Sequence, residues 1–112
     1  MDWEIIYYKK SSGKVPVIDY IKSQEIERAN KILNALRLLK EFGISESLLD
    51  ARKLKGERNK GLYELKIDSS RIIYFLQTDR KFVLVHAFTK KSDKTPKIEL
   101  KIAKRRMKDF MR

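Results

Sequence analysis

Three successive runs set the architecture of this chain: Leu62-Tyr-Glu-Leu-Lys-Ile67, Arg71-Ile-Ile-Tyr-Phe-Leu-Gln77 and Lys81-Phe-Val-Leu-Val-His-Ala-Phe88. Each run is rich in β-branched and aromatic residues, and its side chains follow the two-residue period of a β-strand. Two short polar segments, residues 68–70 and 78–80, join the runs as the turns of a β-meander do. The sequence therefore predicts three consecutive antiparallel strands.

One further strand and two helices are predicted upstream of the meander. Residues 3–8 have the composition of a strand, and Val15-Pro16 opens a short helix. A longer helix over residues 24–42 repeats apolar side chains every three or four positions, and Gly43 ends it. We expect residues 44–60 to form an irregular connection that is basic through Lys53, Lys55, Arg58 and Lys60.

A last helix is predicted downstream, with Thr95 as its N-cap, Pro96 as its first residue and an end near residue 111. The predicted order is β-α-α-β-β-β-α within a single domain, residues 1–112. We expect an α+β fold in which the helices pack on one face of an antiparallel sheet. The other face would stay partly open.

The composition excludes several classes of function. The chain carries 27 Lys and Arg against 15 Asp and Glu, a net charge of +12, and phosphate backbones are the commonest partners of such a protein. No apolar run is long enough to span a bilayer and no signal peptide is visible, so we expect a cytoplasmic protein without a membrane partner. With no cysteine and one histidine, we expect neither a metal site nor a cofactor.

Basic residues gather where the last predicted strand ends. Lys90, Lys91 and Lys94 follow the apolar run that closes at Phe88, and no acidic residue stands beside the first two. Lysines held at a strand end indicate a site for a polyanion. The alternative is that they only keep a loop soluble.

The chain resembles a known family over most of its length, most densely over residues 51–103. The resemblance is carried by Ala51-Arg-Lys-Leu-Lys-Gly56, Gly61-Leu-Tyr-Glu-Leu-Lys-Ile67, Arg71-Ile-Ile-Tyr-Phe75 and His86-Ala-Phe-Thr-Lys-Lys-Ser-Asp-Lys-Thr-Pro96. This series is similar to the phage-derived Gp49-like branch of HigB toxins, in the RelE/ParE superfamily. The resemblance implies a RelE-like fold and the toxin of a type II toxin–antitoxin system.

Such a toxin is an endoribonuclease that cleaves mRNA without a metal ion, usually on the ribosome, and so inhibits translation and growth. Its implied partner is a cognate helix-turn-helix antitoxin of the HigA kind, and the toxin would meet DNA only through that antitoxin. Two other interpretations fit the same charge: a ParE-like toxin that targets a topoisomerase, and a non-catalytic RNA-binding module. The combination of Arg71 with Lys90 and Lys91 favours the nuclease.

The resemblance also implies roles for individual residues. Arg71 corresponds to the arginine that contacts the scissile phosphate, and Lys90 and Lys91 to the basic pair after the last strand. Glu64 and Lys66 occupy strand positions where related toxins place charged groups near the reacting nucleotide.

Two departures leave the proton donor and acceptor unassigned. Ser70 stands where a tyrosine often precedes the arginine, and the last helix offers Phe110 but no tyrosine.

Metal-free RNA cleavage needs a base for the 2′-hydroxyl, a cation for the charged phosphorane and an acid for the 5′-oxygen. The planar guanidinium of Arg71 suits the second task, because it binds two phosphate oxygens at once. Its alternative role is an ion pair with Asp68 or Asp79. Glu64 is either the base or half of a cross-strand ion pair.

Lys90 or Lys91 would be the acid, or would only bind phosphate.

Other residues are candidates for binding RNA rather than for chemistry. Lys53, Lys55, Lys66 and Lys94 would hold phosphates, and Tyr63 would stack on a base. His86 lies mid-strand, and we expect it to be a half-buried histidine rather than a proton donor.

The last helix is basic on one side, which is either a solvated surface or a footprint for ribosomal RNA. Its cations are Lys97, Lys101, Lys104, Arg105, Arg106, Lys108 and Arg112.

Overall fold

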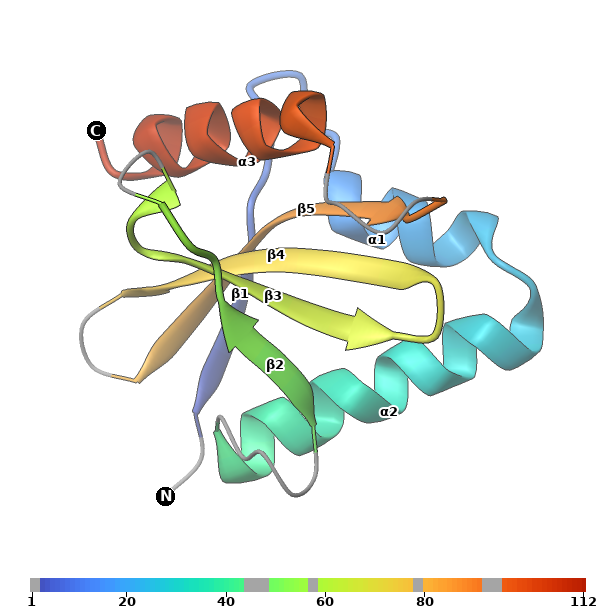
Figure 1. Ribbon diagram of the computed structural model, residues 1–112. Helices are drawn as coiled ribbons and strands as arrows, with labels where there is room; N and C mark the ends of the chain where they lie inside the picture. The colour runs from blue at the N-terminus through green and yellow to red at the C-terminus, as the bar shows by residue number, and fades with distance from the viewer. Residues whose placement is uncertain (1–2, 44–48, 57–58, 78–79, 92–95) are drawn as a thin grey trace.

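Five strands form one sheet, in the spatial order β1-β5-β4-β3-β2 (Figure 1). The strands are β1 (Glu4–Tyr7), β2 (Asp50–Lys53), β3 (Leu62–Ile67), β4 (Ser70–Gln77) and β5 (Lys81–Thr89). Three helices pack around them: α1 (Pro16–Ser23), α2 (Ile26–Phe42) and α3 (Lys97–Phe110). The computed structural model describes residues 3–43, 49–56, 59–77, 80–91 and 96–112. The predicted cap residue Thr95 lies outside them.

The central meander is as predicted, since β3, β4 and β5 pair antiparallel in chain order. The sheet as a whole is mixed, however, because β1 runs parallel to β5, with Glu4 opposite Lys81. The expectation of a purely antiparallel sheet was wrong at this edge. Two-residue periodicity identifies a strand but carries no information on its direction, which here depends on the long connection through α1 and α2.

A second correction concerns β2, which lies within the segment expected to be irregular. Its four residues pair antiparallel with β3, placing Arg52 opposite Glu64 and Asp50 opposite Lys66. The strand was missed because Asp-Ala-Arg-Lys is short and charged and shows no apolar alternation. Such composition is typical of an edge strand, where charge discourages pairing with other chains.

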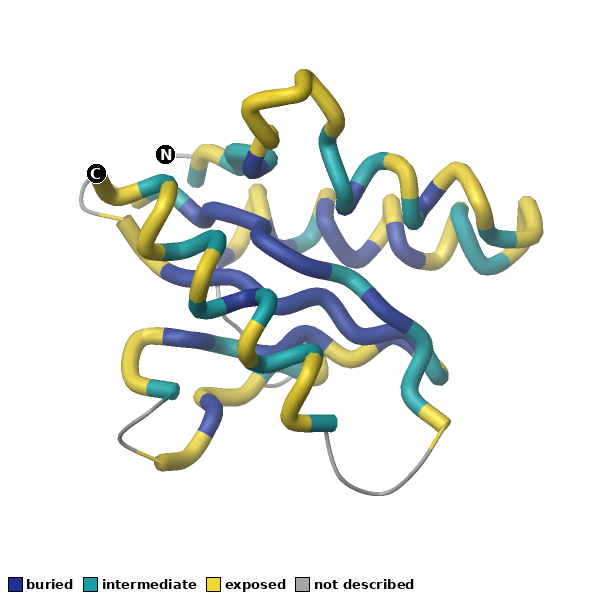
Figure 2. The backbone as a smooth tube through the Cα atoms, turned by 90° about the horizontal axis from the view of Figure 1, so that it is seen from above, coloured by how far each residue is buried: buried dark blue, intermediate teal, exposed yellow. Residues whose placement is uncertain are grey.

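The helices cover both faces of the sheet, contrary to the expectation that one face stays partly open. One core cluster joins α1 and α2 to residues such as Leu65, Ile72 and Tyr74, and a second joins α3 to Ile73 and Phe75. Figure 2 shows the central strands buried along most of their length. The signal was present in β4, because residues 72–75 are apolar without interruption, as in strands covered on both faces.

A β-bulge between β4 and β5 changes which side chains face α3. Ile73 pairs with His86 and Tyr74 with Leu84, so Val85 is left without a partner in the register. Beyond this extra residue, His86 and Phe88 lie on the same face as Val83 and Val85. Phe88 is thereby opposite Arg71, on the face of the sheet that carries α3.

Candidate functional site

A polar pocket of about 210 Å³ opens on the α3 side of the sheet. It lies where β2, β3 and β4 meet beside the end of β5, and its lining consists of Asp50, Arg52, Glu64, Lys66, Arg71 and Lys90. Strand register explains the grouping, because Lys66 pairs with Asp50 on one side and with Arg71 on the other. The pocket thus brings together four of the residues predicted from the sequence: Glu64, Lys66, Arg71 and Lys90.

Arg71 is held rigidly in this pocket and is only 7% exposed. Its Nη1 donates hydrogen bonds to the carbonyl oxygens of Asp68, at 2.7 Å, and Ser70, at 3.0 Å. Its Nε lies 3.8 Å from Glu64 Oε1 and has no hydrogen-bond partner among the described residues. The guanidinium is therefore fixed by the β3–β4 turn, and its Nε lies enclosed beside the Glu64 carboxylate.

The alternative role of Arg71, an ion pair with Asp68, is not observed. Arg71 binds the backbone carbonyl of Asp68, while the Asp68 carboxylate pairs with Lys31 at 3.1 Å. Asp79, the other suggested partner, lies outside the described residues.

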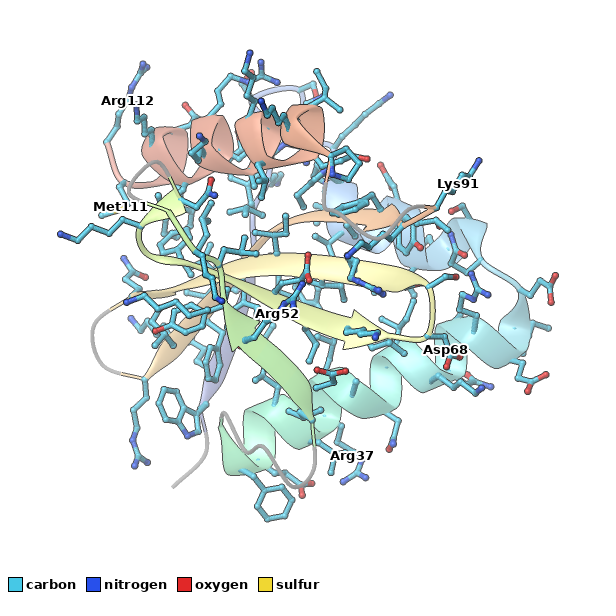
Figure 3. The ribbon with its side chains drawn as sticks, in the orientation of Figure 1. Arg37, Arg52, Asp68, Lys91, Met111 and Arg112 are labelled. Atoms are coloured by element: carbon cyan, nitrogen blue, oxygen red, sulfur yellow. The ribbon has the colours of Figure 1, made fainter. Side chains whose placement is uncertain are left out.

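Glu64 is almost completely buried, with 1% of its surface exposed. Its Oε1 accepts a hydrogen bond of 3.2 Å from Arg52 Nη2, which reaches over from β2 (Figure 3). The cross-strand ion pair that was the alternative for Glu64 is thus present, with Arg71 as a second cation nearby. A buried carboxylate between two guanidiniums orients both of them, and it also stands within the pocket as a possible proton acceptor.

The two lysines after β5 differ in position. The backbone N–H of Lys90 donates to Ser69 O at 2.8 Å, which ties the half-buried Lys90 to the β3–β4 turn and to the pocket. Lys91 is exposed and projects away from the sheet in Figure 3. Of the pair, only Lys90 lines the pocket in the described structure. Lys94 lies outside the described residues.

A cluster of hydroxyl groups sits behind the pocket, on the opposite face of the sheet. The Tyr20 hydroxyl from α1 lies 2.8 Å from Ser70 Oγ and 2.7 Å from Thr89 Oγ1. Ser70 immediately precedes Arg71, Thr89 immediately precedes Lys90, and the two are paired in the β4–β5 register. Tyr20 therefore joins the two strand ends that carry the cations of the pocket.

Sequence reasoning missed Tyr20 and Arg52 as members of this site. Arg52 was placed in a loop, so its register with Glu64 could not be anticipated. For Tyr20 the available signal was the hydroxyl residue before each of the two cations, Ser70 and Thr89. A tyrosine from a distant helix cannot be matched to them without the tertiary structure.

Tyr63 does not reach the pocket. It packs on the α2 side of the sheet, where its ring stacks on Tyr74 with centroids 5.5 Å apart. Adjacent strand residues face opposite sides of the sheet, so Glu64 lies on the pocket side and Tyr63 on the other. Stacking of Tyr63 on an RNA base stays a prediction, and it would have to occur on the α2 side. Lys53 and Lys55 line a separate open hollow of about 580 Å³.

His86 is a buried, fully hydrogen-bonded side chain, as expected. Arg106 Nη1 donates to its Nδ1 at 3.0 Å, so its Nε2 carries the proton and donates to Glu99 Oε1 at 2.8 Å. Burial lowers the pKa of His86, and the nearby Arg106 lowers it further against the opposing effect of Glu99. The neutral imidazole fastens α3 to β5.

Within the described ranges, no three His, Cys, Asp or Glu side chains are grouped so that they could hold a metal ion. None of the described helices combines the length and the apolar character needed to cross a membrane.

Comparisons with known proteins agree with this architecture. The family model described as "Phage derived protein Gp49-like (DUF891)" matches residues 19–108. Among solved structures, the archaeal RelE–RelB complex from Pyrococcus horikoshii OT3 contains a chain that superposes with a TM-score of 0.60 at 17% identity. The match covers 80% of this chain and 96% of that chain. No curated protein matches in sequence. The predicted RelE-like α+β fold is thus confirmed.

Proposed function

This chain belongs to the phage-derived Gp49-like family, and from that premise we propose that it is the toxin of a type II toxin–antitoxin pair. We assign it to the HigB kind, an endoribonuclease that cleaves mRNA on the ribosome without a metal ion. The observation that carries this assignment is the pocket in which Arg71, Lys90 and Glu64 converge.

The scissile phosphate would sit against Arg71. Two backbone carbonyls hold this guanidinium, so its charge is already in place when negative charge grows on the phosphorane. Its Nε is enclosed beside Glu64 Oε1, which helps to keep the guanidinium in this position. Arg52, whose side chain is 65% exposed, stands at the mouth of the pocket and would contact a second oxygen.

The proton transfers would use Glu64 and Lys90, two of the four other ionisable groups that line the pocket. The 2′-oxygen attacks phosphorus as its proton passes to the Glu64 carboxylate, and the 5′-oxygen leaves with a proton from the Lys90 ammonium. The products are a 2′,3′-cyclic phosphate and a free 5′-hydroxyl. Lys66 at the rim would bind a neighbouring phosphate of the same strand.

An antitoxin is the expected protein partner. The archaeal RelE chain of similar fold was crystallised in a complex with RelB. For this chain we propose a HigA-like helix-turn-helix antitoxin that covers the pocket or displaces an element beside it. With a net charge of +12 on the toxin, an acidic antitoxin segment should bind more weakly as salt rises.

The test is expression without an antitoxin, followed by mapping of mRNA ends in the arrested cells. Cleavage within translated messages, reproduced by the purified protein on programmed ribosomes in the presence of EDTA, is the expected result. Intact mRNA together with a poisoned gyrase would assign the protein to the ParE-like class. RNA that is bound but never cut would leave a non-catalytic binding module.

A further inference from the structure

A second basic surface runs along the outer side of α3, and the proposed chemistry does not use it. It is an open groove of about 920 Å³ with Tyr8 and Met107 among its lining residues. The cations that line it are Lys60, Lys101, Lys104, Arg105, Lys108 and Arg112. In the described structure none of these six side chains lines the pocket that holds Arg71.

The cations of this α3 groove have a regular spacing. Five of them lie on α3 or its C-terminal end, at positions 101, 104, 105, 108 and 112, so that a positive charge recurs about once per helical turn. One turn advances about 5.4 Å, similar to the distance between successive phosphates along a nucleic acid strand. Arg112 extends this row beyond the end of the helix (Figure 3).

The single carboxylate in the groove is already engaged. Asp109 Oδ2 accepts a hydrogen bond of 2.7 Å from the Tyr8 hydroxyl, and this bond together with burial raises the pKa of Tyr8. Asp109 therefore has a structural task, fastening the end of α3 to the segment after β1. Its one negative charge stands against the six positive charges that line the groove.

Among the described residues, the lining of the groove offers few apolar anchors for a protein partner. Stable protein interfaces depend on apolar anchors that fill pockets. No strongly exposed large apolar side chain in the described part of the chain lines the groove; the nearest in sequence, Ile98 and Met111, are outside its lining. Tyr8 is 7% exposed, so it offers no free ring for a base to stack on.

From these observations we infer that the α3 groove binds the phosphate backbone of structured RNA, independently of base sequence. A surface that offers positive charge but neither apolar anchors nor exposed aromatic rings can bind phosphates, and it cannot distinguish one base from another. This role of the groove rests on the proposed function. The groove would hold folded RNA while the pocket acts on a single strand. Binding at the groove does not itself require cleavage.

The test measures binding of the full chain to an RNA duplex of about 16 base pairs by fluorescence anisotropy, over a range of roughly 50 to 200 mM salt. The variant carries Lys101→Gln, Lys104→Gln and Lys108→Gln. It should bind at least tenfold more weakly, and the slope of log affinity against log salt should fall by about one per lysine removed. Its melting temperature should stay close to that of the parent, because all three changes are on the surface.

A control removes the same charge from the opposite face, with Lys22→Gln, Lys31→Gln and Lys40→Gln on α1 and α2. Because Lys31 is ion-paired with Asp68, the double variant Lys22→Gln, Lys40→Gln is measured beside it. This control should keep most of the duplex affinity. Equal losses in both triple variants would reduce the effect to net charge and overturn the inference, as would a groove variant that binds like the parent. Preferential binding of an acidic peptide in the groove would also overturn it, in favour of a protein partner.

The outcomes separate this inference from the proposed function. If duplex binding depends on the groove but the parent protein does not cleave mRNA, the RNA-binding role of the groove is supported and the proposed nuclease activity is rejected. If Arg71→Ala abolishes cleavage but the groove variant binds the duplex like the parent, the nuclease activity is supported and the RNA-binding role of the groove is rejected. If the triple variant melts early, Lys108→Gln alone gives the same comparison with an expected slope change of about one.

Discussion

The pocket around Arg71 and the α3 groove are both basic, but their cations are held in opposite ways. In the pocket, four cations share the lining with the carboxylates of Asp50 and Glu64, and backbone carbonyls fix the central guanidinium. In the groove, six mostly exposed cations stand beside a single carboxylate, which accepts a hydrogen bond from a tyrosine. In the pocket, nearby carboxylates and burial weaken the long-range attraction for a phosphate but fix the position of the guanidinium. In the groove, exposed cations attract phosphates strongly but are not held in fixed positions. The first arrangement suits chemistry and the second suits affinity.

The largest effect that this contrast predicts is at Arg71. Arg71→Ala should lower the rate of RNA cleavage by about two to three powers of ten, because a fixed charge at the phosphorane is removed. Arg71→Lys should recover little, since an ammonium cannot replace the planar fork or keep both carbonyl contacts. Single-turnover cleavage and toxicity in cells both measure the effect.

The groove variant with three glutamines is the control for this prediction. It should lose duplex binding but keep the rate of the chemical step on a short single strand. A fully toxic Arg71→Ala protein would show that the catalytic centre lies elsewhere.

The next effect is at Glu64, where the two possible roles separate. Glu64→Gln leaves two guanidiniums without their shared carboxylate, so the free energy of unfolding should fall by about 3 kcal/mol. The value is near the low end for a buried pair because the Arg52 side chain is mostly exposed. Denaturant unfolding measures this loss, and cleavage rate as a function of pH reports any proton acceptor.

Arg52→Ala serves as the comparison, since it removes one arm of the network and keeps the carboxylate. If Glu64→Gln abolishes cleavage at unchanged stability, Glu64 is a base and contributes little to placing the arginines. Loss of stability with retained activity would make it an orienting residue only.

The sequence predicts those parts of the molecule that depend on local periodicity. The meander from Leu62 to Thr89 and both helices before it follow from patterns within each segment. The pairing of β2 and the side of the sheet on which α3 packs depend on contacts between distant segments. The predictions of an irregular segment before β3 and of helices on one face only were therefore wrong. The same division holds in the site, where Arg71 and Lys90 could be found from the chain, but Arg52 and Tyr20 could not.

Tyr63 illustrates a different limit. Its alternation with Glu64 already indicates that the two side chains face opposite sides of the sheet. The aromatic character of Tyr63 favoured RNA stacking, and the register places its partly buried ring against the core residue Tyr74. The alternation of side chains along the strand therefore predicts the face of the sheet on which Tyr63 lies, whereas its residue type does not.

A smaller effect is expected at Tyr20, behind the pocket. Tyr20→Phe removes the hydroxyl that joins Ser70 to Thr89, and so loosens the strand ends that carry Arg71 and Lys90. We expect kcat to fall roughly tenfold with KM unchanged, less than the ~100-fold that a 1 Å misplacement can cost. Tyr63→Phe, which removes a hydroxyl from the same sheet face away from the strand ends, should leave kcat as it was. Equal effects of the two variants would remove Tyr20 from the positioning role.

The smallest effect concerns His86, which fastens α3 to β5. Because burial lowers the pKa of His86 in the folded protein, the unfolded chain binds a proton at a higher pH than the folded one does. The stabilising contribution of the neutral imidazole is therefore present above the unfolded pKa of about 6.5 and is lost as the pH falls below it. Protonation would also place a second cation against Arg106.

Thermal unfolding should show a melting temperature that declines between about pH 7 and pH 5, and His86→Gln should flatten that decline. An unchanged decline in the variant would assign the acid sensitivity to carboxylates elsewhere. A lower cleavage rate in His86→Gln at constant stability would indicate that His86 takes part in the reaction.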